Sequence, residues 1–127
     1  MTLLVDIYID LWVLEDAPAL TRSARDLLDH ADEAYVSAAS VWELCIKMAL
    51  GKLSGSPAAM VQGISASGFV ELPVLAAHAI GVAELPPIHQ DPFDRLLVAQ
   101  ARAASLTLLT ADTELNRYSE VASILRP

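Results

Sequence analysis

Residues 2–9, TLLVDIYI, form an apolar stretch interrupted by a single acid, Asp6. An apolar run of this length is typical of a strand that is buried on both faces of a parallel sheet. A carboxylate in such a strand is unfavourable unless it reaches water, a hydrogen-bond donor or a cation. Asp6 either caps a following helix or belongs to a functional site, and its apolar neighbours favour the functional site.

Strands and helices alternate through the rest of the chain. Further strands are predicted at residues 34–39, 69–74, 106–110 and 121–125. Helices are predicted at residues 10–16, 21–30, 40–51, 57–68, 75–84, 92–105 and 113–118. This alternation predicts an α/β fold, in which helices cover both faces of a mainly parallel sheet. Functional groups in such folds lie beyond the carboxyl ends of the strands.

Length and composition predict a single domain over residues 1–127. Apolar residues make up 54% of the chain, which disfavours disorder. Charges interrupt every apolar run before it reaches the roughly 18 residues of a membrane span. The first residues do not read as a signal peptide, and the single cysteine cannot form an internal disulfide. We therefore expect a cytoplasmic protein without a membrane segment.

The net charge is −8, from 16 acidic and 8 basic residues. Taken alone, this balance argues against binding nucleic acid through a broad basic face. Two explanations keep an RNA ligand open. Several acids can be metal ligands, so that bound cations reverse the local field, or a basic partner protein can supply the missing positive charge.

Glu43 and Asp94 each have a structural and a functional interpretation. Ser40 and Glu43 fit a capping box, although Glu43 also begins a helix directly after a strand, on the same sheet edge as Asp6. Asp91 suits a helix N-cap with Pro92 as the first helical residue. Asp94 is followed by apolar residues at helical spacing, so it lies on the buried side of its helix, which favours a ligand role.

Asp112 follows the strand at 106–110 and either caps the next helix or joins the same sheet edge as the other acids. Carboxylates brought within about 4 Å repel each other by roughly 4 kcal/mol at an effective dielectric constant near 20. Mg²⁺ prefers oxygen ligands and removes this repulsion. Such sites hydrolyse phosphodiesters with a metal-activated water. The chain has no His/Cys spacing typical of zinc.

Four motifs in order resemble the PIN-domain toxins called VapC. They are LLVD, ending at Asp6; VSAASVWE, ending at Glu43; HQDPFD, ending at Asp94; and LLTAD, ending at Asp112. The connecting sequences LGKL at 50–53, GF at 68–69 and LPV at 72–74 also match. The resemblance covers nearly the whole chain, and the order and spacing of the motifs are more specific than any one of them.

The resemblance implies a PIN-like three-layer α/β/α sandwich and an endoribonuclease toxin that depends on Mg²⁺ or Mn²⁺. It also implies a homodimer and a VapB-type antitoxin whose tail occupies the active site. Carried over by motif, the catalytic acids are Asp6, Glu43, Asp94 and Asp112, and Asp6 and Asp94 hold the metal. Thr110 matches the hydroxyl position at the strand end beside these acids.

The chain departs from the family pattern after its first acid. The family usually has Thr or Ser at the position of Ile7, and often His, Asn or Ser at the position of Tyr8. Loss of the hydroxyl removes a hydrogen bond that orients a metal ligand, an effect worth 10–100-fold in metal affinity or activity. This leaves an alternative function, a PIN-fold RNA- or protein-binding module with weak or no catalysis. Asp10 is also unusual, and we expect it to be a solvated acid of the first helical turn.

Two further residues near these motifs have open roles. Arg95 either holds an RNA phosphate or the antitoxin, or forms a surface salt bridge. His89 lies in a proline-rich loop and is expected to be structural or exposed.

Overall fold

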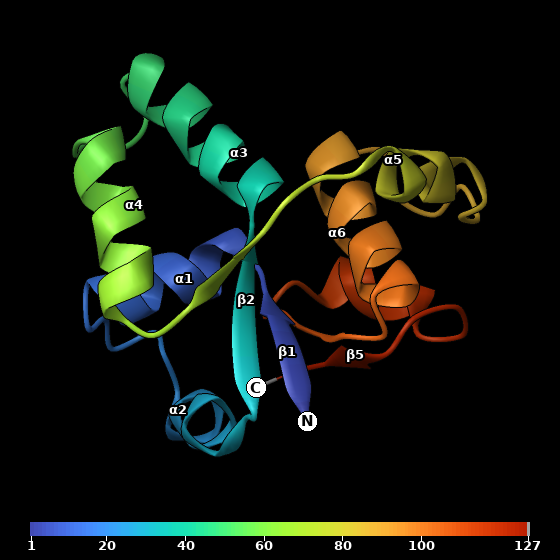
Figure 1. The fold of residues 1–127 in the computed structure, drawn as a ribbon, viewed down its shortest axis with the longest axis horizontal. Helices are drawn as coiled ribbons and strands as arrows, with labels where there is room; N and C mark the ends of the chain where they lie inside the picture. Colours follow the sequence, from blue (N-terminus) through green and yellow to red (C-terminus); the bar gives the residue numbers. More distant parts are fainter. Residues whose placement is uncertain (127) are drawn as a thin grey trace.

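The computed structural model describes residues 1–126 and contains one five-stranded parallel sheet (Figure 1). The strands lie in the order β3-β2-β1-β4-β5. Their bounds are Thr2–Val5 for β1, Glu33–Ser37 for β2, Val70–Leu72 for β3, Thr107–Leu109 for β4 and Ile124–Leu125 for β5. All the pairings are parallel, as the alternation of strands and helices predicts.

Helices cover both faces of the sheet, so the predicted three-layer α/β/α arrangement is confirmed (Figure 1). The helices of one face are α1 at Ile7–Leu14, α2 at Arg22–His30, α3 at Ala38–Ala49 and α4 at Pro57–Ala66. The helices of the other face are α5 at Ala76–Ala83, α6 at Pro92–Ala103 and the 3₁₀ helix η1 at Thr113–Tyr118. Within residues 1–126 no helix is long and apolar enough to cross a membrane.

The central strand β1 explains how one short sequence supports two apolar cores. Successive side chains of a strand point to opposite faces of the sheet. Leu3 and Val5 pack with α1 to α4, whereas Leu4 packs with α5, α6 and η1. All three side chains are fully buried. The continuous apolar run therefore reflects burial on both faces, as predicted.

The predicted strand at 2–9 is wrong beyond Val5, because the chain turns at Asp6 and α1 begins at Ile7. Both Ile7 and Ile9 are buried, but on a helix rather than on an extended strand. A short apolar run does not distinguish a buried strand from a buried helix by its periodicity. The helix predicted at 10–16 accordingly begins three residues earlier.

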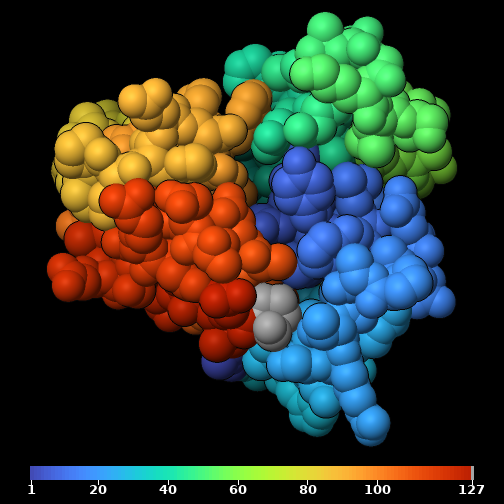
Figure 2. Space-filling model, turned by 180° about the vertical axis from the view of Figure 1, so that it is seen from behind, coloured from blue at the N-terminus to red at the C-terminus, as the bar shows by residue number. Residues whose placement is uncertain are grey.

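The order of the strands reverses next to β1. From β1 the chain proceeds outward to β2 and β3 on one side, and later returns to place β4 and β5 on the other. Loops after β1 and β4 therefore diverge at the carboxyl end of the sheet, the position where α/β folds bind ligands. Figure 2 shows the N-terminal half, blue to green, and the C-terminal half, yellow to red, meeting along this division of the molecule.

Candidate metal-binding site

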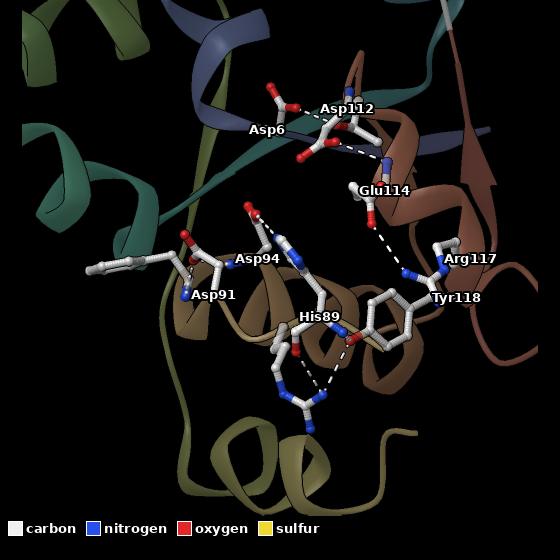
Figure 3. A network of polar contacts seen from close by, with 11 residues as sticks. Asp6, His89, Asp91, Asp94, Asp112, Glu114, Arg117 and Tyr118 are labelled. Carbon is white, nitrogen blue, oxygen red and sulfur yellow. Dashed lines mark hydrogen bonds and ion pairs between the residues drawn. The ribbon is translucent and has the colours of Figure 1, made fainter. Parts of the chain in front are cut away.

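Carboxylates from four separate elements occupy the carboxyl end of the sheet. Asp6 follows β1, Asp112 follows β4, Glu43 lies on α3, and Asp94 lies in the first turn of α6. In Figure 3 Asp6 lies beside Asp112, and the carboxylates of Asp112 and Asp94 face the same space. Electrostatic repulsion links Asp112 to both Asp6 and Asp94, which agrees with their closeness in the figure.

Asp6 is held rigidly at the end of β1. One carboxylate oxygen accepts hydrogen bonds from the backbone N–H groups of Tyr8 at 3.0 Å and Ile9 at 2.9 Å, so the side chain caps α1. The other oxygen accepts a hydrogen bond from the hydroxyl of Thr110. Burial raises the pKa of Asp6, and these hydrogen bonds oppose the rise without cancelling it. Asp6 therefore caps α1 and at the same time lies beside Asp112 at this edge of the sheet.

Glu43 is not part of a capping box. Ser37 is the N-cap of α3, and its hydroxyl accepts a hydrogen bond from the N–H of Ala39 at 3.1 Å. The helix thus begins before Ser40, which is buried inside it, and Glu43 lies in the second turn. The carboxylate of Glu43 therefore has no capping role. The capping box considered from the sequence is wrong.

The surroundings of Glu43 resist a negative charge. Burial raises its pKa to about 7, with further contributions from the carboxylates of Asp91, Asp94 and Asp6. Lys47, one turn along α3, opposes this rise. The ammonium group of Lys47 lies 5.8 Å from the centre of the Tyr8 ring. The carboxylates of Asp91 and Asp94 therefore affect the pKa of Glu43 more than the ammonium group of Lys47 does.

Asp91 and Asp94 divide the two roles that the sequence assigned to them. Asp91 caps α6, because its carboxylate accepts hydrogen bonds from the N–H groups of Phe93 at 2.8 Å and Asp94 at 3.1 Å. The carboxylate of Asp94 is not used in capping, and its side chain is 20% exposed. Burial raises the pKa of Asp94, and the neighbouring His89 opposes the rise.

Asp112 is coupled to Asp6 through Thr110. The Thr110 hydroxyl accepts a hydrogen bond from the N–H of Asp112 at 3.0 Å while it donates to Asp6. Asp112 also caps η1, through a hydrogen bond of 2.9 Å from the N–H of Glu114. Thr110 is completely buried between the two acids. It therefore occupies the position beside the acids that the family resemblance implies.

His89 is a member of this site that the sequence interpretation missed. Its Nε2 atom lies 2.9 Å from a carboxylate oxygen of Asp94, and the two side chains face each other in Figure 3. One ligand atom each from His89, Asp94 and Asp112 lie within 4.8 Å of one another. The signal available in the sequence is the position of His89 five residues before Asp94, in the same HQDPFD motif.

Within residues 1–126 Arg95 does not form the surface salt bridge considered from the sequence. Its guanidinium group donates hydrogen bonds to the carbonyl oxygens of Val82 at 3.0 Å, Pro86 at 3.1 Å and His89 at 3.3 Å. It also donates to the hydroxyl of Tyr118 at 3.1 Å. These contacts fix the loop between α5 and α6 against η1. Arg95 therefore positions the loop that carries His89.

Residues near the first acid differ in exposure. Ile7 is 3% exposed and belongs to the core, and its aliphatic side chain has no hydroxyl to offer Asp6. Tyr8 is 48% exposed. Asp10 is not the solvated acid that we expected. It is completely buried, and neither of its carboxylate oxygens has a hydrogen-bond partner within residues 1–126. Burial raises its pKa to about 7, with repulsion from Asp6 adding to the effect.

The donor set suits a divalent cation that prefers oxygen. Burial, and after it repulsion from neighbouring carboxylates, raises the pKa values of Asp6, Glu43 and Asp94, and a bound cation removes that repulsion. Carboxylates are the ligands that Mg²⁺ and Mn²⁺ commonly take in proteins. When bound, such a cation stabilises charge on phosphoryl oxygens and lowers the pKa of water.

Comparisons with known proteins agree on the fold. The family model of the PIN domain matches residues 4–121. A chain of VapBC2 from Rickettsia felis, solved with a promoter DNA fragment, has a TM-score of 0.75 at 14% identity, covering 100% of this chain and 99% of its own. No curated protein shows significant sequence similarity.

Two other solved structures have the same fold. A chain of FitAcB from Neisseria gonorrhoeae has a TM-score of 0.67 at 21% identity, covering 97% of this chain and 96% of its own. A chain of the DNA-bound VapBC from Salmonella typhimurium has a TM-score of 0.69 at 16% identity, covering 99% and 98%.

Proposed function

This chain belongs to the PIN domain family, and from that premise we propose that it is a metal-dependent endoribonuclease toxin of a VapBC-type toxin–antitoxin module. It hydrolyses RNA phosphodiester bonds at the carboxylates of Asp6, Glu43, Asp94 and Asp112, with Asp6 and Asp94 holding Mg²⁺ or Mn²⁺. Thr110 orients Asp6, and Arg95 acts indirectly through the loop that it fixes.

The observation that carries this proposal is the meeting of four acids from four elements where the strand order reverses. Each acid alone has a local explanation, because Asp6 and Asp112 both cap helices. Capping does not explain Glu43 or Asp94, whose carboxylates are free of that role and repel each other. Acids in such an arrangement are stabilised by a cation, which then provides the chemistry for phosphodiester hydrolysis.

The chain's own residues have separate tasks in this reaction. Asp6 and Asp94 orient the cation, since the backbone of α1 and the Thr110 hydroxyl fix the carboxylate of Asp6. Glu43, whose carboxylate takes no part in capping, is suited to accept a proton from the attacking water. Asp112 adds negative charge beside Asp6 and Asp94 and strengthens cation binding.

Partners of this protein follow from the same proposal. Solved relatives with this fold come from VapBC complexes, which supports a VapB-type antitoxin as the partner. Basic residues on that partner would compensate the net charge of −8. A homodimer and a cytoplasmic location are further parts of the proposal, the latter in agreement with the single cysteine.

The test is cleavage of single-stranded RNA by purified protein in Mg²⁺, in Mn²⁺ and in a chelator. Asp94→Asn removes one carboxylate and is expected to reduce cleavage at least 100-fold. Asp91→Asn is the matched control, because it lies one helical turn earlier and its amide oxygen retains the cap. Full cleavage by Asp94→Asn, or equal cleavage in chelator, contradicts the proposal.

A second candidate is a PIN-fold module that binds RNA or protein with little catalysis. It is favoured by Ile7, which is buried in the core and supplies no hydroxyl to Asp6. Among the described residues, Thr110 makes the one side-chain hydrogen bond to Asp6. Calorimetric titration with Mg²⁺ and Mn²⁺ separates the two candidates. The nuclease binds the cation and loses this binding in Asp94→Asn, whereas a pure binding module binds no cation at this site.

A further inference from the structure

His89 lies close to two acids of the proposed site, although it is not one of the four carboxylates itself. Its imidazole is 26% exposed, and its Nε2 atom lies 2.9 Å from Asp94. Asp112, which lies between β4 and η1, contributes a carboxylate oxygen within 4.8 Å of both ligand atoms. Three segments of the chain therefore converge on one small volume with one nitrogen and two oxygen donors.

The backbone of His89 is fixed by Tyr118, a core residue, and by Arg95, which holds the loop between α5 and α6. Its N–H donates a hydrogen bond of 3.0 Å to the hydroxyl of Tyr118, and its carbonyl oxygen accepts one from Arg95. The same Arg95 nitrogen donates to Tyr118, which is completely buried (Figure 3). The imidazole is therefore held before any ligand arrives, which lowers the entropic cost of binding.

The distances suit coordination of one ion. Ligand atoms about 2.1 Å from a first-row cation lie roughly 3 Å apart when they are neighbours and about 4 Å apart when they are opposite. The 2.9 Å between His89 and Asp94 is already that of neighbouring ligands. The largest separation in the cluster, below 4.8 Å, requires a contraction of less than about 1 Å.

Imidazole changes which cation such a site prefers. Mg²⁺ takes oxygen ligands almost exclusively, whereas Mn²⁺ and later first-row ions also accept imidazole nitrogen. We propose that His89 is a nitrogen ligand of the cation held at Asp94, beside Asp112, and that it makes the site selective for Mn²⁺ over Mg²⁺. This inference rests on the proposed function, because the cation and its ligand Asp94 are the same in both.

The test is direct detection of nitrogen bound to Mn²⁺. Protein without a histidine tag is loaded with Mn²⁺, and pulsed electron paramagnetic resonance is used to find ¹⁴N coupling. We expect the coupling in the wild type and its loss in His89→Gln, which retains a polar group facing Asp94 but no imidazole. His30→Gln is the matched control, because His30 is exposed on α2 and its imidazole hydrogen-bonds to the backbone carbonyl of Asp26, far from the acids of the site in sequence.

Affinities provide a second readout. Titration of Mn²⁺, and competition by Mg²⁺, should show that His89→Gln weakens Mn²⁺ binding about tenfold or more and Mg²⁺ binding by less than about threefold. Equal weakening of both ions contradicts a selective nitrogen ligand. Labelling the wild type with ¹⁵N-histidine gives a readout that does not depend on the folding of a variant. If imidazole is bound to Mn²⁺, the ¹⁴N coupling is replaced by ¹⁵N coupling.

The outcomes separate this inference from the function on which it rests. Mn²⁺ binding that Asp94→Asn removes, without any histidine nitrogen coupling in the wild type, overturns the role of His89 and leaves the nuclease proposal standing. Absence of both Mn²⁺ and Mg²⁺ binding overturns the metal site itself, and the RNA cleavage assay then fails independently. Histidine coupling that survives in His89→Gln also overturns the assignment.

Discussion

The hydroxyl of Thr110 donates a hydrogen bond to the carboxylate of Asp6, across 104 residues of sequence. Both side chains are buried, at 0% and 4% exposure. The same hydroxyl accepts a hydrogen bond from the N–H of Asp112, so a single side chain links the ends of β1 and β4. Since these are adjacent parallel strands, the contact fixes the geometry of the site at the point where the strand order reverses.

Thr110→Val is expected to weaken both stability and catalysis. It replaces the hydroxyl by a methyl group of similar size and leaves a buried carboxylate oxygen and a backbone N–H without their partner. The free energy of unfolding should fall by about 1–3 kcal/mol, and RNA cleavage by about 10–100-fold. Urea denaturation and cleavage rates measure the two effects. Thr110→Ser, which keeps the hydroxyl, should retain most activity; equal loss in both variants contradicts this role of the hydroxyl.

Asp10 is expected to make stability depend on pH. Its pKa is about 7 in the folded state, above the usual value near 4 of an unfolded chain. The folded state therefore retains a proton that the unfolded state has lost, and stability falls as the pH rises from about 4 to about 7. Below pH 4 both states are protonated, so the group adds no dependence there. The total effect is roughly 4 kcal/mol.

Asp10→Asn isolates this effect because asparagine has a similar shape and does not titrate. The variant and the wild type should have similar stability near pH 4, and the variant should be the more stable by several kcal/mol near pH 8. Urea denaturation at a series of pH values measures the difference and cancels the contribution of the other acids. A difference that stays constant from pH 4 to pH 8 would show that the burial of Asp10 does not raise its pKa.

Arg95→Ala is expected to be strongly destabilising. The substitution leaves the carbonyl oxygens of Val82, Pro86 and His89 and the hydroxyl of Tyr118 without their shared donor. The expected loss is roughly 2–4 kcal/mol. Arg95→Lys should recover only part of it, because an ammonium group cannot reproduce the planar donor arrangement. Thermal unfolding measures both variants.

Arg117→Ala provides the control for Arg95. Arg117 is exposed and pairs with Glu114 at 3.2 Å on η1. An exposed pair of this kind contributes less than about 1 kcal/mol. Comparable destabilisation by the two substitutions would contradict a special role for Arg95 in fixing the loop before α6.

The sequence predicted the parallel sheet and the positions of the acids, because both follow from short-range patterns. The apolar run around Asp6 indicated β1, although its end was placed at Ile9 instead of Val5, and the apolar sequence before Asp112 indicated β4. Asp91 and Pro92 similarly predicted the beginning of α6, which the structure confirms. Parallel topology then brings the strand ends to one edge without any knowledge of side-chain contacts.

Features that depend on tertiary packing were not predictable in this way. The beginning of α1 was misplaced because its residues are apolar on nearly every face, and the N-cap of α3 was assigned to Ser40 instead of Ser37 because several small residues stand there. The burial of Asp10 has no signal in the sequence. The contact between His89 and Asp94 depends on a loop that Arg95 and Tyr118 hold, and Tyr118 lies 29 residues further along the chain.

X-ray diffraction from crystals soaked in Mn²⁺, recorded at a wavelength where manganese scatters anomalously, tests the cation site most directly. We predict one strong anomalous peak within coordination distance of carboxylate oxygens of Asp6 and Asp94. The peak should be absent from crystals of Asp94→Asn. A wild-type crystal with no peak beside these two residues, at Mn²⁺ concentrations that support RNA cleavage, would contradict a metal-dependent nuclease site at this edge of the sheet.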